Sequence, residues 1–415
     1  MNRNYYTVAL IMLIFFVISF LTNVIGPLIP DIIKGFNLSL TLVAILPFAF
    51  FIAYGVMSIP AGMLIEKYQE KKIMIAAFVV AFFGSLLLAL IPNYLTAVLS
   101  LFLIGCGMAM LQVVINPLLR TSGGEEHYAF NSVLAQLIFG AASFLSPLVY
   151  SYMVQHLNDR HTFLSYFRTI VPSNLQWISL YWLFSGICLL MVVVVALSNL
   201  PKVQLSKAEE VGPIQTYYTL FKKKVVILYF IAMISYVGTE QGIANWISQF
   251  LATYHGYDPQ TKGAEEVAYF WGLMTAGGVV GLLLLKIMDS RKVLISFTIL
   301  AITCLTFSLF GSARISLIAF PLTGFFASVM YPIIFSLALN SVKEHHGSFS
   351  GIIVTGIIGG AIVPLIIGWI GDHSGLRVGM FFLYLTMGYI LSIGFWASPF
   401  ITNKTIRLFG KKEIE

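Results

Sequence analysis

Charged residues are scarce in this sequence. Asp, Glu, Lys and Arg together make up 10% of the 415 residues, whereas soluble domains contain about 25%. A soluble chain of this length would fold into two or three domains, each covered by its own polar surface. The few polar residues here cannot cover such surfaces, so the composition excludes a soluble globular protein.

Cysteine and histidine are also rare, and their positions argue against a metal centre. Cys106, Cys188 and Cys304 all fall within apolar segments, which is typical of small core residues rather than of disulfides or metal ligands. The seven histidines fall in expected loops or at helix ends. We therefore predict that the chain has no metal site.

The motifs of common enzymes and nucleotide-binding proteins are missing. No Ser/His pair, paired Asp or His-Glu-x-x-His arrangement lies within the apolar segments. The glycine pairs Gly277-Gly278 and Gly359-Gly360 lack the Gly-Lys-Ser/Thr that follows a phosphate loop. We interpret them as points of close packing between helices. The chain is predicted not to be an enzyme and to hold no cofactor.

The sequence does contain a series of long apolar segments. Hydrophobic residues make up 59% of the chain, and the mean hydropathy is +0.90. A helix of about twenty apolar residues crosses a bilayer, so we predict an all-α polytopic protein embedded in lipid. Its twelve transmembrane helices are predicted at 7–33, 42–65, 72–92, 95–119, 128–154, 176–199, 223–253, 265–287, 292–311, 314–340, 348–371 and 377–400.

The positions of the basic residues predict the orientation. With the N-terminus inside, 18 of the 24 Lys and Arg residues fall in cytoplasmic segments. The other six are Lys34, Arg160, Arg168, Lys262, Arg314 and Arg377. Cytoplasmic connections are enriched in Lys and Arg, so we expect both termini in the cytoplasm. The net charge of +7 therefore reflects topology, and no nucleic-acid partner is expected.

The two halves of the chain match at a nearly constant offset. Three pairs of motifs recur 215 to about 220 residues apart: Asn116-Pro117 with Tyr331-Pro332, Ser146-Pro147 with Val363-Pro364, and Glu66-Lys67 with Asp289 and Arg291. Transporters built from two six-helix repeats bind substrate between the repeats, near the bilayer midplane. We predict two pseudo-symmetric six-helix bundles at 1–200 and 222–415, joined by a cytoplasmic linker at 201–221. Twelve spans make a monomer sufficient.

One carboxylate lies at membrane depth. The stretch 235–246 places Glu240 inside the seventh span, where a charge costs at least about 2–3 kcal/mol. Every other carboxylate is assigned to a loop, a tail or a helix end. Glu240 is either a structural carboxyl bonded to a neighbouring helix or a functional residue that couples H⁺ or Na⁺ or accepts a sugar hydroxyl. Intramembrane acids usually mark transport paths, so we favour coupling. An offset of 217 residues pairs Asn23 with Glu240, which predicts that the two face each other across one cavity.

Amide and aromatic side chains supply further candidate contacts. Amides donate and accept hydrogen bonds, as polyol recognition requires, although they also bridge helices in lipid. Aromatic rings stack on sugars, although most rings in a chain with 14% aromatic residues pack in the core or contact lipid. The predicted substrate-binding residues are Asn23, Gln112, Asn116, Gln136, Gln241, Asn245, Trp246 and Tyr331. The charged loops containing Glu66, Lys67, Asp289 and Arg291 are interpreted as gating loops that also supply positive-inside charge.

Several of these motifs together resemble one known family. The run Leu111-Gln112-Val113-Val114-Ile115-Asn116-Pro117 resembles the LQ-x-x-x-NP stretch of the glucose/galactose branch of the bacterial fucose–galactose–glucose:H⁺ symporters. That family belongs to the major facilitator superfamily. Similar matches occur in spans five, seven, ten and eleven: Leu134-Ala135-Gln136, Tyr236-Val237-Gly238-Thr239-Glu240, Met330-Tyr331-Pro332-Ile333-Ile334-Phe335, and Gly359-Gly360-Ala361-Ile362-Val363-Pro364 with Gly368 and Asp372. The resemblance implies monosaccharide uptake across a bacterial inner membrane.

The chain also departs from the pattern of that family. Ile25-Gly26 replaces an Asn-Asp pair usual in span one, and Gly278 stands where span eight commonly has an Arg. Gln112 replaces the Glu of the fucose-type members. An acid and a base are thus both absent. Either Glu240 alone couples a cation, or the protein is an uncoupled uniporter.

These observations predict a secondary active transporter. Its substrate is a neutral monosaccharide, such as a glucose-, galactose- or fucose-like hexose, which it imports by alternating access. The alternative transport function is efflux of amphipathic or drug-like compounds, which the 34 Phe, 20 Tyr and 15 Met residues favour. A sensor or another non-transporting membrane protein is the alternative outside transport.

Overall fold

Long helices make up almost all of the described chain. The computed structural model describes residues 4–400, with gaps at 125–126, 160–162, 201–213 and 343. The helices of the first half are α1 (Tyr5–Thr22), α2 (Ile25–Phe36), α3 (Leu40–Tyr68), α4 (Glu70–Leu90), α5 (Tyr94–Gly123), α6 (Tyr128–His156), the 3₁₀ helices η2 (Phe163–Thr169) and η3 (Gln176–Ile178), and α7 (Ser179–Leu197).

The second half continues in the same manner. Its helices are α8 (Ile214–Phe221), α9 (Lys224–Ala244), α10 (Ile247–His255), the π-helix η4 (Pro259–Gly263), α11 (Ala264–Ile287), α12 (Ser290–Phe310), α13 (Ala313–Ala327), α14 (Met330–Leu339), α15 (His346–Thr355), η5 (Gly356–Ile358), α16 (Gly359–Ser374), α17 (Leu376–Gly379) and α18 (Phe382–Trp396).

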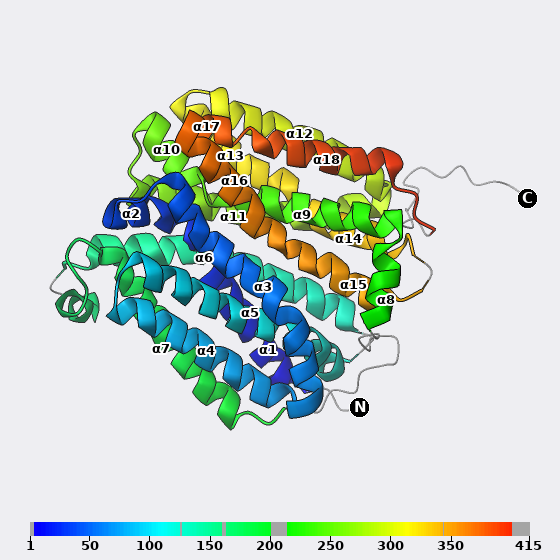
Figure 1. Cartoon of the computed structure of the whole chain (residues 1–415), viewed down its shortest axis with the longest axis horizontal. Coiled ribbons are helices and arrows are strands. Elements are labelled where there is room, and N and C mark those ends of the chain that lie inside the picture. The colour runs from blue at the N-terminus through cyan, green and yellow to red at the C-terminus, as the bar shows by residue number, and fades with distance from the viewer. Residues whose placement is uncertain (1–3, 125–126, 160–162, 201–213, 343, 401–415) are drawn as a thin grey trace, which may run out of the picture.

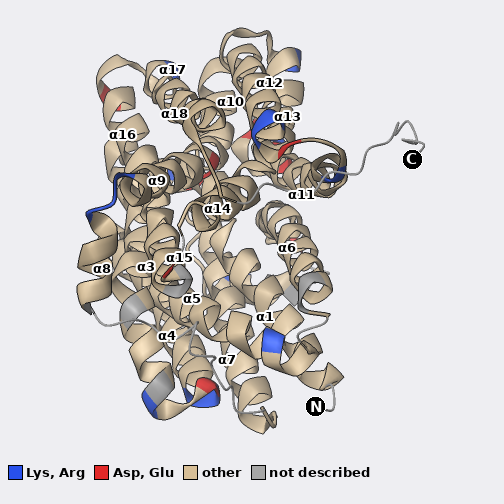
Figure 2. Cartoon of the chain, turned by 90° about the vertical axis from the view of Figure 1, so that its right-hand side faces the viewer, with Lys and Arg blue, Asp and Glu red and all other residues tan. Residues whose placement is uncertain are grey.

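The twelve predicted membrane spans are confirmed. Within the described residues, twelve helical stretches are long and apolar enough to cross a bilayer, and each overlaps one prediction. Figure 2 shows the charged residues at helix ends and connections, while most of the helical surface carries none. The predicted linker contains helix α8, which packs against α9 and α15. Residues 201–213 of that linker lie outside the described part of the chain.

All twelve spans lie along one axis of the molecule. In Figure 1, α1 begins and α18 ends on the right, which we call the terminal end, and α2, α10 and α17 lie at the opposite end, the far end. The first half occupies the lower part of that view and the second half the upper part. Helices α3 and α6 of the first half pack against α16 and α11 of the second. These two helix pairs form the flanks of the contact between the halves.

Several spans are interrupted, which the sequence prediction missed. Span one breaks at Asn23-Val24, span seven at Asn245-Trp246 and span ten at Ser328-Val329. Pro27 and Pro332 each lie four residues after a break, where they cannot donate to the carbonyl of Asn23 or Ser328. Broken helices at membrane depth are typical of transporter binding sites. The break in span seven has no such proline.

The far end brings spans one and seven into close contact. A Cβ on Gly26 of α2 would lie 2.3 Å from the carbonyl oxygen of Ala244, so only glycine permits this approach. Helix α2 also contacts α10, η4 and α11 of the second half. These contacts close the far end of the interface between the halves.

Candidate functional site

Glu240 lies one turn before the end of α9 and is half-buried. Its Oε2 accepts a hydrogen bond of 2.5 Å from the Tyr236 hydroxyl, and its Oε1 accepts one of 3.1 Å from Gln241 Nε2. Tyr236 lies four residues earlier, on the same helix face. No ion pair to Glu240 occurs within the described residues. The carboxyl group is therefore held by two neutral donors and has no bound basic side chain.

Aromatic rings continue from this carboxyl group into span ten. The Tyr236 ring lies 5.7 Å from the ring of Tyr331 on α14, and Tyr331 stacks on Phe335 at 5.9 Å. The structure thus brings the predicted contact Tyr331 close to Glu240. Sequence reasoning missed Tyr236 as a site residue, although its i, i+4 spacing to Glu240 could have identified it. A wall of three rings beside a hydrogen-bonded acid can present both stacking and polar contacts to a ligand.

The residues that follow Glu240 are buried within the protein. Gln241 is 5% exposed, and its amide is used by Glu240. Asn245 is 2% exposed, and its Nδ2 has no hydrogen-bond partner among the described residues. Trp246 is fully buried and donates from Nε1 to the Pro364 carbonyl at 3.3 Å. In this conformation the Trp246 side chain, at the break between α9 and α10, is bonded to α16 and presents no face for stacking on a sugar.

The amides of the first half are more accessible. Asn116 on α5 and Gln136 on α6 are exposed, and Gln112 is half-buried. Asn116 Nδ2 donates to the Gln112 carbonyl at 3.3 Å. Gln136 lies one turn before Gly140, where a Cβ would meet Thr275 of α11 at 2.0 Å. Gln136 therefore lies on the face of α6 that meets the second half, at a level where the contact has ended.

Asn23 ends α1 and is 5% exposed. Its Nδ2 donates to Ser143 Oγ on α6 at 2.8 Å and to Ser19 Oγ at 3.3 Å. This amide therefore joins two helices of its own half. The breaks of spans one and seven place Asn23 in register with Asn245, 222 residues later. The sequence analysis paired Asn23 with Glu240 by an offset of 217 residues, which was taken from motifs in other spans. The offset given by the helix breaks is five residues longer.

The charged loops form contacts within their own halves. Asp289 and Arg291 form an ion pair at 3.3 Å, and Arg291 Nη1 donates to the Ala397 carbonyl at 3.4 Å. Partial burial opposes ionisation of Asp289, but Arg291 outweighs it and lowers the pKa of that carboxyl below its usual value. The Lys67 ammonium lies over the Tyr68 ring at 5.0 Å. The side chain of Glu66 lies outside the described part of the structure.

Two carboxylates that the sequence analysis assigned to helix ends, Glu266 and Asp31, are not freely exposed. Glu266, in the first turn of α11, is 2% exposed, and its Oε2 finds no hydrogen-bond partner in the described part of the chain. Asp31 on α2 accepts hydrogen bonds from both halves of the chain. Both residues lie near helix ends, so sequence position gave no signal of their burial or partners.

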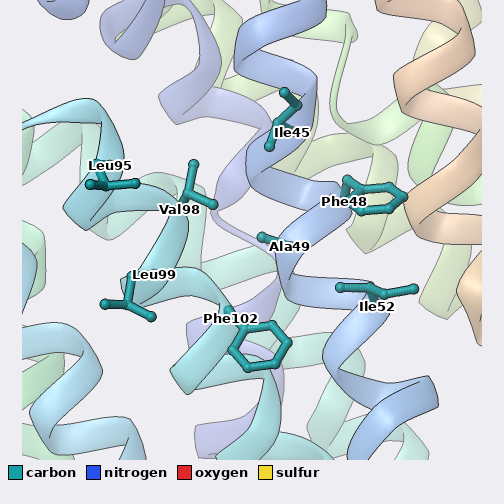
Figure 3. A pocket seen from close by; sticks show the side chains of 8 residues that line it. All are labelled: Ile45, Phe48, Ala49, Ile52, Leu95, Val98, Leu99 and Phe102. Carbon is teal, nitrogen blue, oxygen red and sulfur yellow. The ribbon is translucent and has the colours of Figure 1, made fainter.

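A surface hollow of about 420 Å³ between α3 and α5 has no polar lining (Figure 3). It is lined by Ile45, Phe48, Ala49, Ile52, Leu95, Val98, Leu99 and Phe102. A sugar site requires hydrogen-bonding groups, so this hollow is not the candidate site. No cluster of potential metal ligands occurs among the described residues. Cys106, Cys188 and Cys304 are free thiols; Cys106 and Cys188 are buried, as predicted for core residues, whereas Cys304 is only half-buried.

Sequence comparison finds transporters along nearly the whole chain. The profile of the Major Facilitator Superfamily matches residues 11–363. A glucose/galactose transporter of Brucella abortus is 27% identical over 400 residues, which cover 95% of this chain and 94% of that protein. The L-fucose-proton symporter of Escherichia coli is 26% identical over 388 residues, 88% of this chain and 87% of that protein.

Comparison with solved structures finds the same fold. The Escherichia coli fucose:proton symporter FucP, in its outward conformation, superposes with a TM-score of 0.66 and 23% identity over 94% of this chain and 98% of that one. A bacterial homologue of the human lysosomal transporter Spinster, inward-facing and occupied, superposes with a TM-score of 0.78 and 13% identity over 95% and 96%. At these identities, the likeness concerns the fold alone.

Proposed function

This chain belongs to the Major Facilitator Superfamily, and from that premise we propose that it is a secondary active transporter for a neutral monosaccharide. Members of this superfamily are transporters rather than enzymes. The relatives named as glucose/galactose transporters and L-fucose-proton symporters support a hexose of glucose, galactose or fucose type. Transport proceeds inward by alternating access, with H⁺ or Na⁺ as the coupling ion.

The observation that carries this proposal is the bonding of Glu240. A carboxyl group at membrane depth, held by Tyr236 and Gln241 without a bound base, has the properties of a cation-coupling group. A permanent ion pair would leave such a group little freedom to bind and release a cation. The adjacent ring of Tyr331 and the exposed amides Asn116 and Gln136 supply stacking and neutral hydrogen bonding for a sugar.

The arrangement of the two halves supports alternating access. The halves meet at the far end, while Gln136 is exposed on the face of α6 that points toward the second half. In our proposal the far end faces outward and is closed here, so the site opens to the cytoplasm. Both termini are then cytoplasmic, the membrane is a bacterial inner membrane, and the monomer is the transporting unit. The two six-helix bundles, 1–200 and 222–415, are the bodies that rock.

Uptake into proteoliposomes tests the function directly. The purified protein is reconstituted and offered a panel of labelled hexoses, with and without an inward H⁺ or Na⁺ gradient. Gradient-dependent accumulation of one sugar is expected. Equilibration without accumulation indicates a uniporter. If no sugar is taken up and drug-like cations are extruded instead, the sugar proposal is wrong.

A further inference from the structure

One carboxylate on each half of the protein is bonded to the other half. Asp31 belongs to α2 of the first half and is half-buried. Its Oδ2 accepts a hydrogen bond of 2.6 Å from the Tyr150 hydroxyl on α6, within the same half. Gln260 Nε2 of η4, in the second half, donates to Oδ1 at 3.1 Å and to Oδ2 at 3.0 Å. Asp31 thus joins α2 and α6 to the loop that precedes α11.

The second carboxylate belongs to the second half and accepts its hydrogen bonds from the first half. Asp372, near the end of α16 in the second half, accepts from the backbone N–H groups of Leu40 and Thr41 at 2.8 Å each. The Thr41 hydroxyl adds a bond of 2.5 Å. These donors are the first residues of α3 in the first half, so the carboxylate caps a helix N-terminus across the interface. The positive end of a helix dipole favours such an anion.

Both sets of bonds lie at the far end, one on each flank of the contact between the halves. Asp31 lies beside the α6–α11 pair and Asp372 beside the α3–α16 pair. The close contact of Gly26 with Ala244 belongs to the same end. The halves cannot separate at the far end unless the bonds from Gln260 to Asp31 and from Leu40 and Thr41 to Asp372 break. By contrast, the charged contacts of Arg291 join parts of one half.

We propose that Asp31 and Asp372 are the two gate residues of the far end, and that they set the equilibrium between its closed and open states. The inference rests on the proposed alternating access but on no particular substrate. Asp31 is the stronger gate, because its bonds are partly shielded from water, whereas Asp372 is exposed and water competes for it. Opening returns both carboxylates to water, so each gate shifts the equilibrium toward the closed state without preventing opening.

Distances between spin labels report this equilibrium without any sugar. One label pair, Leu95→Cys with Ile315→Cys, spans the far end, and a second, Leu197→Cys with Phe395→Cys, spans the terminal end. All four positions are exposed and distribute between the two halves. A Cys304→Ser background suffices, because Cys106 and Cys188 are buried. Double electron–electron resonance is recorded on the full chain in nanodiscs with Asp31→Asn, Asp372→Asn and both together.

The loss of hydrogen bonds to a carboxylate predicts a clear shift. The ratio of open to closed far end is expected to rise about tenfold for Asp31→Asn and by a smaller factor for Asp372→Asn. The terminal-end pair should move closer in the same samples. Glu265→Gln is the matched control, because Glu265 also lies at the far end and its one ion pair among the described residues is with Lys262 of its own half, at 3.0 Å. That variant should leave both distance distributions unchanged.

A second variant keeps the test decisive if Asp31→Asn folds poorly. Gln260→Ala removes the donor from the other half and leaves the bond from Tyr150 to Asp31 in place. It is expected to open the far end as Asp31→Asn does. Unchanged distances in Gln260→Ala and Asp372→Asn would overturn the gate proposal. Because the readout needs no transport, a distance shift in a protein that takes up no sugar would refute the proposed substrate while supporting the gate.

Discussion

Replacing Glu240 with glutamine is expected to abolish accumulation while leaving exchange of sugar intact. The amide keeps the size of the side chain and still accepts from Tyr236, but it cannot bind and release a proton or balance a metal cation. Entry of one cation yields about 2.3 kcal/mol per 100 mV of membrane potential. This free energy supports about 50-fold accumulation at one cation per sugar. Glu240→Gln should therefore lower the accumulation ratio from about 50 to about 1.

The assay needs two measurements on the same proteoliposomes. Steady-state accumulation under an imposed potential and cation gradient reports coupling. Counterflow of labelled against unlabelled sugar, with no gradient, reports binding and the change of access. The control is Glu265→Gln, which removes a far-end carboxylate that pairs with Lys262 of its own half. That variant should retain both activities.

The structure also predicts how strongly Tyr236, the hydrogen-bond donor to Glu240, affects the binding of the coupling cation. Tyr236→Phe removes the hydrogen bond of 2.5 Å to Oε2. A hydrogen bond to a charged group contributes about 1.5–3 kcal/mol, so the cation concentration at half-maximal uptake should shift about tenfold or more.

Full accumulation by Glu240→Gln would refute the coupling role. Loss of counterflow together with accumulation would assign Glu240 to the sugar instead.

Four further predictions follow from individual contacts. Gly359→Ala places a Cβ 2.1 Å from the Ile234 carbonyl oxygen and should lower the melting temperature strongly, whereas Gly278→Ala, with nothing within 4 Å, should be tolerated. Asn23→Ala loses the bond to Ser143 and should destabilise the protein by about 1–2 kcal/mol in thermal unfolding; an unchanged melting temperature would contradict a structural role. Gln136→Ala should raise the KM for sugar about tenfold without changing the melting temperature, because the amide is exposed and, within the described residues, no hydrogen bond to another helix holds it; an unaltered KM would exclude it from the site. Burial and the nearby Arg377 lower the pKa of His255, so its contribution to stability is present above about pH 6.5 and is lost as the pH falls through the lowered pKa; melting temperatures between pH 7 and 5 should fall less in His255→Gln.

The sequence alone determined the architecture because lipid imposes strict local requirements. A segment that crosses a bilayer must satisfy its own backbone hydrogen bonds, so span length and hydropathy suffice to locate each helix. All twelve predicted spans overlap an observed one for this reason. The same local logic singled out Glu240, since an acid at membrane depth is detectable from its position. The motifs around Gln112, Glu240 and Tyr331 were also sufficient to suggest the family.

Contacts between distant helices decided what the sequence could not. No feature of the local sequence indicates that Asn23 donates to Ser143 or that Gly26 lies against Ala244. The local sequence also does not indicate that Trp246 is buried and bonded to α16. The register between the repeats also required the helix breaks, which match Asn23 with Asn245. Asp31 and Asp372 looked like ordinary charges at helix ends, because their partners lie 229 and more than 330 residues away. Only packing of the two halves brings those groups together, and the proposed alternating access requires these contacts between the halves to break.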